Sequence, residues 1–70
     1  DKGETVTNPF SGEQYDLNGV ELSMYDFIMG SQYVMEVAPK TVTQKQINEF
    51  HKAITWFRKN NVEAYMVLLD

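Results

Sequence analysis

The chain has 70 residues, a net charge of −4 and no cysteine, and 43% of its residues are hydrophobic. This length provides one domain, and the hydrophobic content excludes an intrinsically disordered chain. The absence of cysteine excludes disulfide bonds and thiolate metal sites. We expect residues 1–70 to form a mainly α, small three-helix domain with a short N-terminal β-hairpin.

The first 17 residues are expected to contain the hairpin. Residues 1–7 are polar and are expected to be mobile at the chain start. Asn-Pro and Ser-Gly turn signals follow, so residues 8–17 are predicted to form a turn or hairpin, with strands near residues 5–7 and 14–17. The pairing over residues 5–17 stays open at this level. Three side chains are expected to hold the hairpin against the helices: Phe10, Tyr15 and Leu17.

The next segment, residues 18–36, is predicted to be the central helix. Asn18 is a favourable N-cap, and Glu21 is placed to complete a capping box. Helical spacing puts apolar residues on two sides. One side carries Val20, Met24, Phe27, Ile28, Val34 and Met35, and the other carries Leu22, Tyr25, Met29 and Tyr33. Gly30 weakens the helix and predicts a gap, a kink or a close helix crossing there.

Two further helices are predicted, over residues 43–60 and 61–69. Thr43 and Gln46 have the spacing of a capping box for the first of them. Its apolar stripe is Ile47, Phe50, Ala53, Ile54 and Phe57. Asn61 is placed to cap the last helix, although a strand is an alternative over so few residues. Its inward side chains are expected to be Val62, Tyr65, Leu68 and Leu69.

A helix that is apolar on two sides has more apolar surface than a short chain readily covers. The second apolar side therefore predicts a protein-interaction patch of Leu22, Tyr25, Met29 and Tyr33, with Asp26 and Glu36 as charged rim. The alternative is that the hairpin or the last helix covers these residues. Trp56 is a second candidate, for contact with a partner or with the hairpin.

Catalytic and metal signatures are not found in the sequence. His51 is the single histidine, and neither a nucleophile nor a carboxylate stands at a telling spacing from it. We therefore predict no enzyme activity, no metal site and no cofactor. The longest apolar run is too short to cross a membrane, so no membrane association is expected.

Charge is distributed unevenly along the chain. Residues 1–36 contain seven acids and one base, a net −6, whereas residues 37–70 contain three acids and five bases, a net +2. An acidic chain repels phosphate backbones, so direct nucleic-acid binding is disfavoured. The asymmetry suits docking to a complementary protein surface, with an ordinary solvated surface as the alternative.

Two stretches carry a resemblance to a known group of proteins. NPFSGE at residues 8–13 and WFRKNNVEAYMVLLD at residues 56–70 resemble small proteins encoded by tailed bacteriophages. Val62 stands where that pattern has proline. The resemblance implies a phage accessory protein in the bacterial cytoplasm that binds and inhibits or redirects a host protein, and it transfers no functional residues.

These observations favour a non-catalytic protein-binding module. Its partner would be a host protein or a second copy of the chain, which would give a homodimer. Two alternatives remain open. One is an acidic nucleic-acid mimic that blocks a host nucleic-acid-binding enzyme, and the other is a structural component of the virion or of its assembly.

Overall fold

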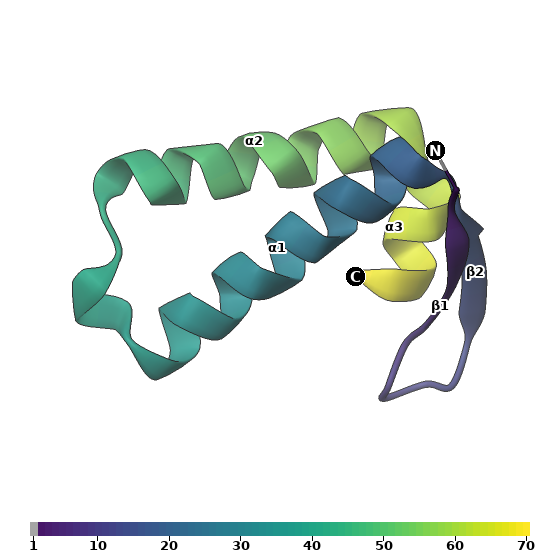
Figure 1. Ribbon diagram of the computed structural model, residues 1–70, viewed down its shortest axis with the longest axis horizontal. Coiled ribbons are helices and arrows are strands. Elements are labelled where there is room, and N and C mark those ends of the chain that lie inside the picture. Colours follow the sequence, from purple (N-terminus) through teal and green to yellow (C-terminus); the bar gives the residue numbers. More distant parts are fainter. Residues whose placement is uncertain (1) are drawn as a thin grey trace.

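The structure, a computed structural model, describes residues 2–70. A two-stranded hairpin comes first and three helices follow, as expected for a small mainly α domain (Figure 1). In chain order the elements are β1 (Glu4–Thr7), β2 (Gln14–Leu17), α1 (Gly19–Val37), a short 3₁₀ turn η1 (Pro39–Thr41), α2 (Gln44–Asn60) and α3 (Val62–Leu68). The predicted helix ranges agree with these bounds to within one residue at each end.

The hairpin is antiparallel, with Val6 opposite Tyr15. The expectation of a mobile start is wrong for residues 4–7, because β2 pairs with them and is itself held by Leu17, which is buried. Asp1, part of the same prediction, lies outside the described residues. The predicted turn carries Gly12 at φ 78°, in the left-handed region that favours glycine.

Asn8 organises the turn between the two strands. Its side-chain oxygen accepts hydrogen bonds from the backbone N–H groups of Phe10 at 2.8 Å and Ser11 at 3.3 Å. Its side-chain amide donates to the carbonyl of Val67 in α3 at 2.9 Å. Phe10 does not hold the hairpin, contrary to the prediction, because its ring is 99% exposed. The Asn8 amide provides that link to the helices instead.

Each helix begins at the residue that the sequence indicates. Asn18 and Glu21 form a reciprocal capping box at the start of α1, and Thr43 and Gln46 form another at the start of α2. The Asn61 side chain accepts a hydrogen bond from the Ala64 N–H at 3.1 Å, which starts α3 as a helix rather than a strand. Gly30 lies inside the unbroken α1, and a Cβ added there would meet no atom within 4 Å. The predicted close crossing at Gly30 is therefore wrong.

The core lies at one end of the molecule, where β2, the first half of α1, the end of α2 and α3 meet. Its seven buried hydrophobic residues are Leu17, Tyr25, Ile28, Ala53, Phe57, Ala64 and Leu68. From this end α1 and α2 diverge toward the η1 connection (Figure 1). No residue between Met29 and Lys52 is buried. The second half of the helical pair therefore has apolar side chains but no core of its own.

Polar side chains join the elements at the closed end of this helical pair. The Asn61 amide donates to one Glu21 carboxylate oxygen at 2.9 Å, and the Asn18 backbone N–H donates to the other at 3.0 Å. The Tyr15 hydroxyl donates to the Glu63 carboxylate at 2.6 Å. These bonds tie β2 to α3, and the start of α1 to the α2–α3 junction.

Candidate functional site

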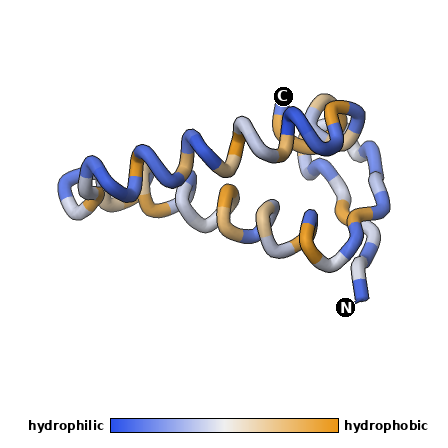
Figure 2. The backbone as a smooth tube through the Cα atoms, turned by 90° about the horizontal axis from the view of Figure 1, so that it is seen from above, coloured by the Kyte–Doolittle hydropathy of each residue, from blue (hydrophilic) through white to orange (hydrophobic). Residues whose placement is uncertain are grey.

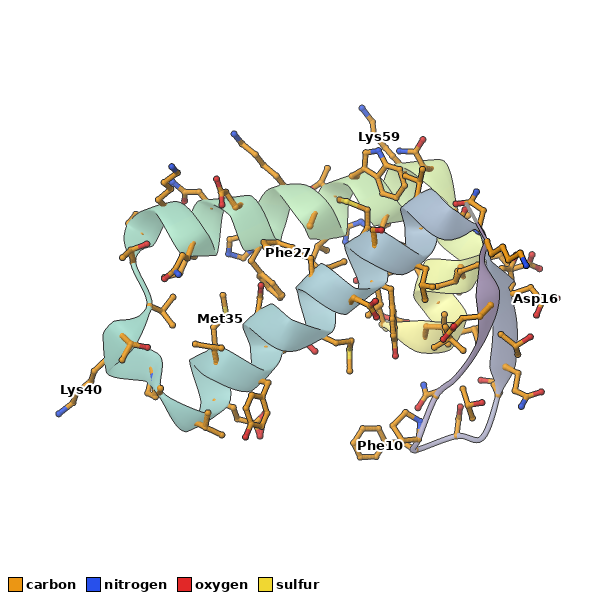
Figure 3. All side chains as sticks on the ribbon, viewed as in Figure 1. Phe10, Asp16, Phe27, Met35, Lys40 and Lys59 are labelled. Atoms are coloured by element: carbon orange, nitrogen blue, oxygen red, sulfur yellow. The ribbon has the colours of Figure 1, made fainter. Side chains whose placement is uncertain are left out.

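A groove lies between the diverging parts of α1 and α2, with a volume of about 340 Å³. On one side it is lined by residues of α1: Asp26, Phe27, Gly30, Ser31, Val34 and Met35. On the other side it is lined by Val42 before α2 and by Gln46 and Glu49 of α2. Figure 3 shows Phe27 and Met35 in the space between the two helices. We call this surface the α1–α2 groove.

The apolar side chains of the groove are only partly covered. Phe27 is 43% exposed and Val34 is 40% exposed. Val20, one further heptad toward the N-terminus, is 57% exposed, so the three form a stripe with a spacing of seven residues. Hydrophobic segments recur along the helices in the tube of Figure 2. Residues seven positions apart lie on nearly the same side of a helix, so these three side chains face one direction.

A second hollow of about 280 Å³ shares Met35 and Val42 with the groove. Ile47 and Phe50 of α2 contribute to its wall, together with His51. His51 is exposed, and its ring meets that of Phe50 edge to face at 5.7 Å between centroids. The apolar stripe predicted for α2 thus extends into space that α1 does not fill.

The predicted interaction patch is divided in the structure. Tyr25 is buried in the core and Leu22 packs against it half-buried, so these two are core residues and the prediction for them is wrong. Met29 and Tyr33 are exposed, at 37% and 66%. The four residues lie on one side of α1. In the first half of the helix this side packs against the core, and in the second half the same side is exposed to solvent.

The remaining predicted site residues lie in three different places. Asp26 is exposed and lines the groove, which is a different surface from the patch that it was predicted to border. Glu36 is exposed near the end of α1 and does not line the groove. Trp56 is half-buried and packs against the core cluster, so most of its ring is unavailable to a partner.

Sequence reasoning assigned the groove residues Phe27 and Val34 to the enclosed side of the central helix, and the structure corrects this. Val62 of α3, expected to face inward, is also 56% exposed. Phe27 and Val34 are partly exposed for a geometric reason. The second half of α2 packs against the first half of α1, and the two helices diverge beyond that contact.

Two tyrosines have perturbed acidity. The hydrogen bond to Glu63 is the main cause that raises the pKa of Tyr15 above its ordinary 10.0, with desolvation and the Glu63 and Glu21 charges adding to it. Burial raises the pKa of Tyr25, and the Asp26 charge adds to this. Both shifts stabilise the neutral phenol, so these groups act as hydrogen-bonding and packing residues at neutral pH.

Within residues 2–70, no cluster of three or more His, Asp or Glu side chains is arranged to hold a metal ion. In the same part of the chain, none of the helices combines the length and the apolar character that spanning a membrane requires. Comparison of the chain with protein-family models, with curated proteins and with solved structures returned no match.

Proposed function

We propose that this chain is a non-catalytic protein-binding module whose binding site is the α1–α2 groove. The observation that carries the proposal is that no residue between Met29 and Lys52 is buried, although both helices carry apolar side chains there. Leaving Phe27 and Val34 partly in water forgoes about 25 cal/mol for each Å² of apolar surface, which a partner recovers on binding. Contiguous exposed apolar patches rimmed by polar residues are a mark of protein-interaction sites and ligand grooves.

The mode of binding that fits is a helix laid into a groove. Such grooves lie between two helices and receive apolar side chains at helical spacing from the partner. The core at the closed end fixes α1 and α2 against each other at one end, so the groove between their diverging parts is formed before the partner arrives. Preformed sites lose less conformational entropy on binding than flexible ones.

The resemblance of residues 8–13 and 56–70 to phage-encoded proteins extends the proposal to a bacterial host protein as the partner. In that setting the chain would act as a phage accessory protein that inhibits or redirects the host protein. Occupying a helix-binding or helix-presenting surface of the host protein would suffice for either effect.

Gly30 provides the test, because a side chain added there enters the groove and meets no protein atom within 4 Å of its Cβ. Gly30→Trp should fill the groove and leave the fold intact, whereas Gly30→Ala should leave the groove open. Immobilised wild-type protein and Gly30→Ala are expected to retain the same protein from a bacterial lysate, and Gly30→Trp is expected to lose it. Retention that is equal for all three proteins excludes the groove as the binding site.

A further inference from the structure

The two helices that form the groove carry opposite charges. Helix α1 contains three acids and neither lysine nor arginine, a net charge of −3. Helix α2 contains four bases and one acid, a net charge of +3 with His51 neutral. The charge that a partner meets in the groove therefore depends on which of these side chains line it.

None of the four bases of α2 lines the groove. Lys45, Lys52 and Lys59 recur every seven residues, on the side of α2 opposite its apolar stripe. Figure 3 shows Lys59 pointing outward from the molecule. The single acid of α2, Glu49, lines the groove together with Asp26 of α1, and neither lysine nor arginine is among the lining residues. The groove is thus apolar with a negative border.

From this arrangement we infer that the groove accepts a basic amphipathic helix of another protein. This inference rests on the function proposed above and adds the chemistry of the partner. Apolar side chains of the partner would contact Phe27 and Val34, and lysines or arginines beside them would meet Asp26 and Glu49. From Asp26 to Met35 the α1 wall of the groove covers nine helical steps, about 14 Å, which corresponds to about two and a half turns of a bound helix.

A second copy of the chain fits this groove poorly. Its α1 has the required apolar stripe but brings three more acids and neither lysine nor arginine to Asp26 and Glu49. Its α2 is basic, but the lysines lie opposite the apolar stripe rather than beside it. Like charges that face each other across an interface weaken binding, so the acids of a second α1 disfavour self-association through this groove.

The test uses two labelled synthetic peptides of about 16 residues, long enough for four helical turns. Both have an alanine-rich background and the same leucines at positions i, i+3, i+7 and i+10. One has lysines beside the leucines and the other has glutamates at the same positions. At low salt, the lysine peptide is expected to bind wild-type protein at least about tenfold more tightly than the glutamate peptide. Asp26→Asn combined with Glu49→Gln is expected to remove this preference.

Binding must also depend on the groove itself. Gly30→Trp is expected to weaken binding of the lysine peptide by about tenfold or more. Tyr33→Ala, at an exposed residue of α1 that does not line the groove, is expected to leave the affinity unchanged. Should Gly30→Trp fail to fold, Val34→Asn serves as a second groove variant, since Val34 is 40% exposed. Circular dichroism establishes that each variant is folded.

Three outcomes would overturn the inference. The first is equal affinity for the two peptides, and the second is binding of the lysine peptide that Gly30→Trp leaves unchanged. The third is a wild-type dimer in sedimentation that Gly30→Trp dissociates, since a second copy would then occupy the groove. If groove-dependent capture from lysate persists while the peptides bind equally, only the charge of the partner is wrong. If that capture is also absent, the proposed function fails as well.

Discussion

The side-chain amide of Asn61 donates a hydrogen bond to the carboxylate of Glu21 at 2.9 Å, across 40 residues of sequence. It connects the start of α1 to the junction of α2 and α3. The same Asn61 side chain accepts from the Ala64 N–H and so caps α3. One residue therefore starts the last helix and holds α1 and α2 together at the end from which they diverge.

Substitution of Asn61 should destabilise the domain. We expect Asn61→Ala to lower the free energy of unfolding by about 1–3 kcal/mol, because it removes a helix cap and a hydrogen bond to a charged group. The measurement is urea-induced unfolding followed by circular dichroism. Asn60→Ala is the matched control, since the Asn60 side chain is exposed and donates its hydrogen bond to the carbonyl of Trp56 within its own helix. Equal effects of the two substitutions would show that the bond to Glu21 contributes nothing.

Two glycines should respond to alanine in opposite directions. At Gly30 the added methyl group meets open space inside a helix, so Gly30→Ala should raise the free energy of unfolding by about 0.5–1 kcal/mol. At Gly3 an added Cβ would lie 1.6 Å from the Leu17 carbonyl oxygen, so Gly3→Ala should displace the start of the hairpin and destabilise it. Thermal unfolding of both variants tests this. A destabilised Gly30→Ala variant would mean that a neighbour does approach α1 at that position.

Tyr25 and Tyr33 belong to the same predicted patch but have different surroundings. Tyr25 is 9% exposed and lies in the core, whereas Tyr33 is 66% exposed. We expect Tyr25→Ala to cost about 3–5 kcal/mol, which is comparable to the whole stability of a domain this small. Tyr33→Ala should change the stability by less than about 0.5 kcal/mol. One-dimensional NMR spectra decide the matter, since Tyr25→Ala should lose the dispersion that Tyr33→Ala keeps. A well-dispersed spectrum of Tyr25→Ala would show that Tyr25 is not required for the core.

Stability should decline in alkaline solution. The folded protein raises the pKa of Tyr15 and of Tyr25 above 10.0. The unfolded chain therefore loses these two protons at lower pH than the folded protein does. Their contribution to stability is complete below about pH 10 and is lost as the pH rises through the folded-state pKa values.

Melting temperatures measured between about pH 8 and pH 11 test this linkage. Wild-type protein should show a fall that begins near pH 10, and Tyr15→Phe should show a smaller fall, because phenylalanine has no proton to lose. Identical pH profiles for the two proteins would show that Tyr15 does not contribute to the alkaline loss of stability, which would leave Tyr25 as the contributor of the pair.

The sequence determined the local features, because their causes lie within a few residues. Asn18 with Glu21 and Thr43 with Gln46 place both helix starts, since a capping box needs only side chains three positions apart. The hairpin turn at Asn8–Gly12 was identified for the same reason. Long-range links were not predictable at this level, and the Asn8 bond to Val67 and the Asn61 bond to Glu21 span 59 and 40 residues.

Only the tertiary structure decided which apolar residues of α1 are covered. Periodicity places Phe27 and Ile28 on the same side of the helix, yet Ile28 is fully buried and Phe27 is 43% exposed. Tyr25, on the predicted outer side, is enclosed by the core at the closed end. The outcome depends on the angle at which α2 leaves α1 and on where α3 and β2 pack. Those quantities are set by contacts among all the elements, so a helix that is apolar on two sides does not encode them by itself.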